Sequence, residues 1–268
     1  MALVSRVLVA AAGLPLVLAL VYLGGWWLFG LAALVAGLAL HEFARMTRPL
    51  RPLVLAGYVG VIAMLVGVRV GGLAWLLGAV LLTLLAAFVL QGLAGTRQTA
   101  TVAIGSTLLG TVWVGLGLAH LVLLRDLPEK GRLVILTVLL AVFAADTFAF
   151  FIGRLIGRHK LAPIMSPGKT WEGFIAGTAA AVAVAFFSLY PDRESFLTIP
   201  QSLVLGAVVA LAAALGDLFE SALKRDMQVK DSGRILAGHG GMLDRIDAHL
   251  FAAPAAFYLI LAFGYSSP

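Results

Sequence analysis

The polar residues between positions 217 and 247 have the types and spacing that phosphate chemistry needs. Four of them share one face of a helix because they are spaced by three, four and seven residues: Asp217, Glu220, Ser221 and Lys224. Asp244 and Asp247 follow a glycine-rich stretch, GHGG at 238–241. Either aspartate alone equally fits the ordinary role of a carboxylate at a helix N-terminus. Clustered carboxylates without His or Cys partners, however, are the ligand set of a hard cation such as Mg²⁺.

These charges stand in a chain that otherwise avoids charge. Hydrophobic residues make up 62% of the 268 positions and charged residues 12%, whereas a soluble domain carries about 25% charged residues. Long apolar runs without alternation favour membrane-spanning helices and exclude a β-barrel. The sequence therefore predicts an all-α polytopic membrane protein. Because cysteine is absent, disulfides and thiolate metal sites are excluded.

Nine apolar segments are near the length that a helix needs to cross a bilayer. They are 5–23, 26–44, 53–69, 72–91, 101–124, 133–152, 173–190, 200–222 and 246–264. The third is the weakest because glycine and Arg69 interrupt the stretch between it and the fourth. Gly173 and Gly177 are spaced for close helix packing. We expect residues 1–100 to form a scaffold of transmembrane helices and residues 101–268 to form the catalytic region.

The cations divide unevenly between the two sides of this predicted bundle. With nine spans, fourteen of the nineteen Lys and Arg residues share the side of the N-terminus. The positive-inside rule then places the N-terminus and both long basic loops in the cytoplasm. The same rule explains the basic composition without nucleic acid as a partner.

Six acidic residues fall within or at the ends of spans, all toward the cytoplasmic side: Glu42, Asp146, Asp217, Glu220, Asp244 and Asp247. An acid in lipid costs roughly 2.5 to 3.5 kcal/mol on insertion scales, so such residues indicate function. A cation-coupled transporter is one alternative. Transporters place their acids near the midplane and often contain inverted repeats, whereas these acids lie at one surface and the sequence has no repeat.

The C-terminal half resembles the phosphatidate cytidylyltransferases, also called CDP-diacylglycerol synthases. The resemblance rests on SALKRDMQVKDSGRILAGHGGMLDRID at 221–247, supported by PIMSPGKTWEG at 163–173, GDLFES at 216–221, and Asp146. It implies that CTP and phosphatidate give CDP-diacylglycerol and pyrophosphate. The lipid phosphate is already an oxyanion near neutral pH, so the reaction needs no general base. A related enzyme acting on an ether-lipid phosphate, and dCTP in place of CTP, remain open alternatives.

The resemblance also implies roles for individual residues. Mg²⁺, with or without a second, monovalent cation, is expected on Asp217, Asp244, Asp247 and Asp146. The expected catalytic residues are Asp217, Asp244, Asp247, Lys224, Arg225, Lys230 and Asp231. The expected substrate-binding residues are Ser166, Lys169, Thr170, Glu172, Ser221, His239, Gly240, Gly241 and Arg245. The expected partners are CTP, phosphatidate, membrane lipids and a second copy of the chain, with the site on the cytoplasmic face of a bacterial inner membrane.

Overall fold

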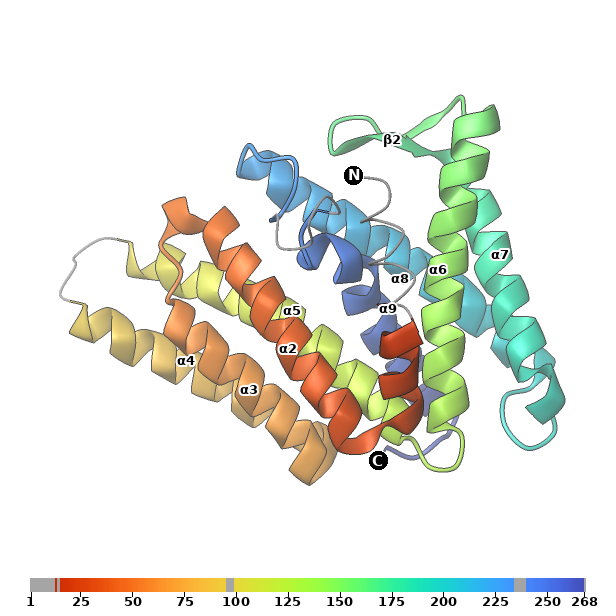
Figure 1. The fold of residues 1–268 in the computed structure, drawn as a ribbon, viewed down its shortest axis with the longest axis horizontal. Helices are drawn as coiled ribbons and strands as arrows, with labels where there is room; N and C mark the ends of the chain where they lie inside the picture. The colour runs from red at the N-terminus through yellow and green to blue at the C-terminus, as the bar shows by residue number, and fades with distance from the viewer. Residues whose placement is uncertain (1–12, 14, 95–98, 234–239, 268) are drawn as a thin grey trace.

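Eight long helices account for most of the chain (Figure 1). The computed structural model describes residues 13, 15–94, 99–233 and 240–267. The long helices are α2 (Gly25–Met46), α3 (Val54–Gly71), α4 (Trp75–Leu93), α5 (Ala100–Asp126), α6 (Gly131–Ile156), α7 (Trp171–Leu189), α8 (Ile199–Asp226) and α9 (Leu243–Ala262). Short 3₁₀ turns occur at Arg48–Leu50 (η1), Gly72–Ala74 (η2) and Tyr190–Asp192 (η3). Residues 15–23 belong to a further helix.

The described residues contain seven segments that are long and apolar enough to span a membrane. One of them, Val54–Leu93, contains both α3 and α4, which pack against each other after the turn at η2. These segments confirm an integral membrane protein with a bundle of helices. The count of nine spans stays a prediction, because nearly half of the first expected span, 5–23, lies outside the described residues.

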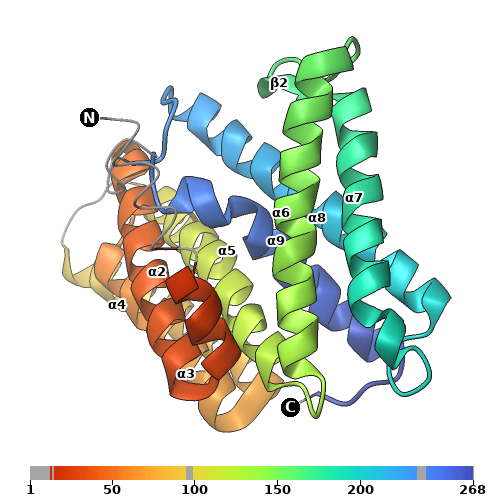
Figure 2. The same ribbon diagram turned by 45° about the vertical axis from the view of Figure 1, so that its right-hand side comes forward.

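Helix α9 lies between two groups of helices. Helices α2 to α5 form one group, and α6 to α8 form the other, as the two views in Figures 1 and 2 show. Helix α9 packs against α5 and α2 on one side and against α8 and α6 on the other. Its buried face includes Phe257 and Ile260, both fully shielded from solvent. The helix therefore joins the two groups through one continuous apolar core.

Helices α6 and α7 pack closely, as the glycine spacing predicted. A Cβ added at Gly173 or Gly177 would lie 2.5 Å from a backbone carbonyl oxygen of α6, that of Ala149 or Ala145 respectively. Any side chain at either position would push the two helices apart. The packing role expected for this glycine pair is confirmed.

A β-hairpin between α6 and α7 was not predicted, and it is an addition to the all-α fold that the sequence indicated. Strands β1 (Lys160–Ala162) and β2 (Ser166–Thr170) are antiparallel, with Lys160 opposite Thr170 and Ala162 opposite Ser166. The segment lacks the alternating apolar pattern of a half-buried strand. Its position depends instead on contacts with α8, which sequence spacing does not reveal.

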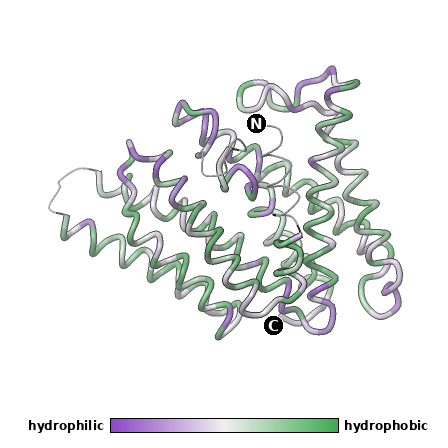
Figure 3. Tube along the Cα trace, in the orientation of Figure 1, coloured by the Kyte–Doolittle hydropathy of each residue, from purple (hydrophilic) through white to green (hydrophobic). Residues whose placement is uncertain are grey.

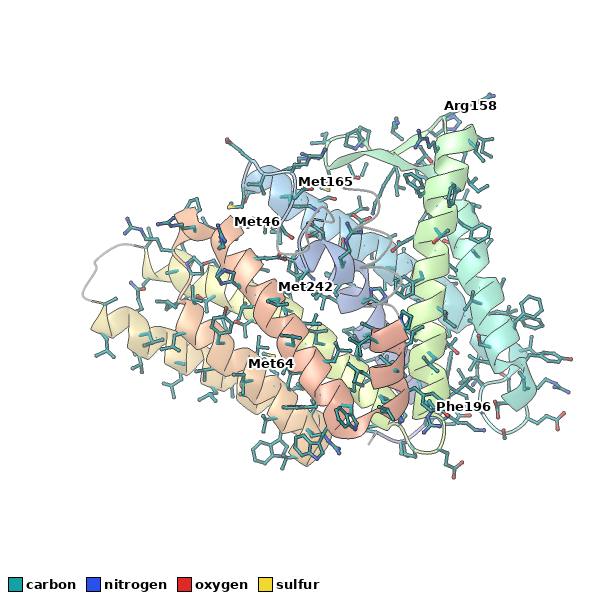
Figure 4. The ribbon with its side chains drawn as sticks, in the orientation of Figure 1. Met46, Met64, Arg158, Met165, Phe196 and Met242 are labelled. Carbon is teal, nitrogen blue, oxygen red and sulfur yellow. The ribbon has the colours of Figure 1, made fainter. Side chains whose placement is uncertain are left out.

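Polar residues gather at the two ends of the bundle and leave an apolar band between them (Figure 3). Figure 4 labels Arg158 and Met165 at the end that carries the hairpin and Phe196 at the opposite end. At this opposite end, Arg69 pairs with Asp126 at 3.5 Å, and Lys130 pairs with Asp192 at 2.5 Å. The hairpin end holds the charged residues that the sequence singled out.

Candidate active site

A cavity of about 760 Å³ opens at the hairpin end, among α6, α7, α8, α9 and the hairpin. This volume is within the range of small-molecule sites. Its charged lining consists of five acids and four cations: Asp146, Asp217, Glu220, Asp244, Asp247, Arg154, Lys160, Lys169 and Lys224. Five of the six acids predicted to converge therefore share one cavity. The sixth, Glu42, is not part of its lining.

Close packing of α8 on α9 brings two of these acids together. A Cβ at Gly216 would lie 2.5 Å from the carbonyl oxygen of Asp247, so only glycine fits there without separating the helices. The neighbouring Asp217 and the Asp247 side chain then face the same cavity, and Asp146 reaches it from α6. Like charges that share one cavity repel one another. Such an arrangement favours a bound cation.

Lys224 joins α8 to α9 through two ion pairs. Its Nζ atom lies 2.6 Å from Oε2 of Glu220 and 2.8 Å from Oδ1 of Asp244. The Glu220 side chain is 1% exposed and that of Lys224 is 14% exposed. The polar stripe predicted on α8 is confirmed. In this structure, however, Lys224 neutralises two acids and also fixes the position of α9.

Two cationic residues hold the hairpin over the cavity. Nζ of Lys169, in β2, lies 2.7 Å from Oδ2 of Asp217, and the other Asp217 oxygen accepts a hydrogen bond from Ser221 at 3.3 Å. Nε of Arg225 donates to the carbonyl oxygen of Met165 at 3.3 Å. These contacts explain why β2 lies beside α8, and they place Lys169 where an anionic ligand in the cavity would meet it.

Asp244 is surrounded by hydrogen-bond donors. Besides Lys224, it accepts the backbone N–H of Gly241 at 2.8 Å and that of Ser232 at 3.2 to 3.3 Å. Gly240 has φ +81°, a conformation that glycine adopts without strain, and it directs the chain into the first turn of α9. Asp244 therefore fixes the backbone at Ser232 and Gly241, as a carboxylate at a helix N-terminus commonly does.

The carboxylates fit Mg²⁺ in their chemistry but are not arranged around a single point. Among the residues that the structure describes, no group of three or more His, Cys, Asp or Glu side chains forms a ready metal centre. Asp146 and Asp247 line the cavity beside Asp217, and hard cations prefer such oxygen ligands. The predicted ligand Asp244 accepts from Lys224 and from the backbone N–H groups of Ser232 and Gly241, whereas Asp217 accepts from the side chains of Lys169 and Ser221.

Several other predicted site residues lie outside this cavity. Lys230 and Asp231 line a second cavity of about 620 Å³ that also includes His41, Glu42 and Arg45. Glu172 accepts hydrogen bonds from the ring and the backbone of His159, so it braces the connection from α6 to α7. Arg245 does not line the main cavity, and the predicted residue His239 lies outside the described residues.

The remaining predicted residues are at the hairpin. Ser166, Lys169 and Thr170 all line the main cavity. The hydroxyl of Thr170 also accepts the backbone N–H of Gly173 at 3.2 Å, which caps the N-terminus of α7. Thr170 is buried, so the role that its contacts support is the structural one of capping α7.

Two cations in the cavity lining were missed from the sequence. Arg154 lies two helical turns beyond Asp146 on the same face of α6, and Lys160 stands opposite Thr170 in the hairpin. Continuing the helical spacing from Asp146 past the predicted end at residue 152 would have found Arg154. Lys160 depends on the hairpin, which the spacing did not indicate.

Known proteins resemble the chain along nearly its whole length. It matches the cytidylyltransferase family over residues 4–263. It is 32% identical to a phosphatidate cytidylyltransferase of Mycobacterium bovis over 92% of this chain and 84% of that protein. It is 37% identical to one of Bacillus subtilis over 60% and 59% of the two chains, and 41% identical to one of Haemophilus influenzae over 49% and 46%.

Coverage differs among these relatives. The aligned region spans less than two thirds of the Bacillus and Haemophilus proteins and most of the Mycobacterium protein. The match over residues 4–263 includes both the hairpin and the helices that carry the clustered carboxylates. The chain therefore belongs to the cytidylyltransferase family.

Proposed function

We propose that this protein transfers the cytidylyl group of CTP to phosphatidate and forms CDP-diacylglycerol and pyrophosphate. A phosphate oxygen of phosphatidate bonds to the α-phosphorus of CTP, and the bond from that phosphorus to the bridging oxygen of the β-phosphate breaks. The observation that carries the proposal is the main cavity, where five acids and four cations meet at one end of an apolar bundle. The names of the bacterial relatives support the same reaction.

Each charged group has a task that its position allows. Lys160, Lys169 and Arg154 offer cations to phosphate oxygens from the hairpin and α6. Asp146, Asp217 and Asp247 would hold Mg²⁺, which neutralises negative charge on the phosphates when it is bound. Lys224 keeps Glu220 and Asp244 paired, and so fixes the spacing of α8 and α9. Catalysis then consists of aligning two anions.

The location of the cavity suits one soluble and one lipid substrate. It opens at the polar end of helices that are long enough to span a bilayer, so a lipid phosphate and a nucleotide can meet there. We propose that this end faces the cytoplasm of a bacterial inner membrane, because the sequence assigns most of the cations to this side. Assembly as a homodimer stays a prediction.

The direct test is pyrophosphate release by purified protein in lipid nanodiscs. CTP, phosphatidate and Mg²⁺ together should give pyrophosphate, and omitting any one of them should abolish its release. Chelation by EDTA should stop the reaction, and added Mg²⁺ should restore it. Pyrophosphate release with an ether-lipid phosphate but not with phosphatidate would show that the ether lipid is the substrate. Ion flux in the absence of CTP would favour a transporter.

A further inference from the structure

Glu42 is an acid from the N-terminal helices that lies outside the main cavity and yet is almost completely buried. It is on α2, and its residue is 1% exposed. Its Oε2 atom accepts the backbone N–H of Leu243 at 2.9 Å, across 201 positions of sequence. Leu243 is the first residue of α9, where the backbone N–H groups have no partner within the helix. Glu42 therefore caps α9 from another helix.

The backbone at positions 233 and 241, in front of α9, lies close to this carboxylate. A Cβ at Gly241 would lie 2.5 Å from Oε2 of Glu42, and one at Gly233 would collide with Oε1. Both glycines thus allow the backbone to approach Glu42 closely, which gives the Gly241 of the signature a role apart from ligand contact. The helix dipole also favours a negative charge at this end of α9.

Asp244 also holds the backbone in front of α9. Gly241 and Ser232 donate their backbone N–H groups to Asp244, which faces the main cavity. Glu42 and Asp244 therefore both hold described backbone in front of α9, Glu42 at positions 233, 241 and 243 and Asp244 at positions 232 and 241. A movement of this backbone would displace Asp244 and, through Lys224, the contact of α9 with α8.

We propose that Glu42 is a positioning residue for the active site. It fixes the start of α9 and the backbone in front of it, so that Asp244 and Asp247 keep their places in the cavity. We call the contacts of Glu42 with Leu243, Gly241 and Gly233 the Glu42 clamp. Its consequence for catalysis rests on the proposed function, whereas the existence of the clamp does not. The N-terminal helices would then contribute to the active site, because α2 carries Glu42.

The test is hydrogen–deuterium exchange of the protein in nanodiscs, measured without CTP or Mg²⁺. Glu42→Ala removes the acceptor, so exchange in the peptide over residues 240–245 should become about tenfold faster. Glu42→Gln keeps an acceptor oxygen of the same reach, and its exchange should stay within about threefold of the wild type. His41→Ala is the matched control, since His41 is the exposed neighbour on the same helix.

A second measurement connects the clamp to turnover. Glu42→Ala should lower kcat at least about tenfold, and Glu42→Gln should recover most of that loss. Unchanged exchange in Glu42→Ala would overturn the proposal, as would equally faster exchange in every peptide or equal loss of protection in Glu42→Gln. If the wild type released no pyrophosphate, the proposed function would fail, while the exchange pattern would still decide whether the clamp exists.

Discussion

The two ends of the helix bundle use charge in different ways. At the end away from the hairpin, charges form separate pairs such as Lys130 with Asp192, whose side chains remain 26% and 27% exposed. At the hairpin end, Lys224 is shared by two acids, and the Glu220 side chain is 1% exposed. Exposed pairs contribute little to stability, and buried ones are expensive to desolvate. Charge that is buried at such a cost indicates a functional site. The pairs at the opposite end need no function beyond keeping that end of the bundle soluble in water.

The largest difference between the ends should appear in catalysis. Asp247→Asn keeps the size of the side chain but removes a negative charge from the cavity. We expect cytidylyl transfer to fall on the order of 1,000-fold, the scale seen when one electrostatic contact to a transition state is removed. Pyrophosphate release in nanodiscs measures the effect.

The control for this substitution is Asp192→Asn at the opposite end, which should change turnover less than about twofold. Turnover of Asp247→Asn within tenfold of the wild type would remove this acid from the catalytic group.

The second largest difference between the two ends should appear in the free energy of unfolding. Lys224→Met leaves Glu220 and Asp244 without their shared cation, and breaking a buried pair in this way costs about 3–5 kcal/mol. The free energy of unfolding in detergent, followed by tryptophan fluorescence, should fall by that order. If Lys224→Met were as stable as the wild type, the two acids would not depend on this lysine.

A smaller loss of activity should follow when α8 is moved away from α9. Gly216→Ala places a methyl group against the backbone of Asp247, and a shift near 1 Å at a catalytic group can reduce turnover about 100-fold. Gly78→Ala is the control, since nothing lies within 4 Å of a Cβ added there. Equal activity of the two variants would show that the close approach at Gly216 is not needed.

The smallest effect is expected at the opposite end. Lys130→Met removes one ion pair that water still reaches, and the free energy of unfolding should change by less than about 1 kcal/mol. The same unfolding measurement applies. A loss as large as that of Lys224→Met would erase the distinction between the two ends.

The helices were predictable because long apolar runs have few alternatives to a membrane span. Their ends were less so. Helix α6 continues from the expected 152 to Ile156, and α8 continues from 222 to Asp226, because an apolar run marks only the part of a helix that can lie in lipid. The stripe on α8 was also predictable, since its spacing alone determines which residues share a face.

The features of the structure that the spacing of residues did not predict are those that depend on contacts between distant segments of the chain. The hairpin is held by α8, through Lys169 with Asp217 and Arg225 with Met165. The contact of Glu42 with Leu243 joins α2 to α9. Local sequence cannot show which distant residue a loop will meet, so Lys230 was expected beside the other catalytic residues and was found in the second cavity.

The ion pair between Lys169 and Asp217 has a consequence for how a polyphosphate and a divalent ion would affect each other's affinity for the site. A polyphosphate that attracts Lys169 releases Oδ2 of Asp217, and that oxygen is then available to a divalent ion. A divalent ion that occupies Asp217 likewise releases the lysine for the polyphosphate. Thermodynamic linkage makes this coupling reciprocal, so nucleotide and metal should each raise the affinity for the other by the same factor.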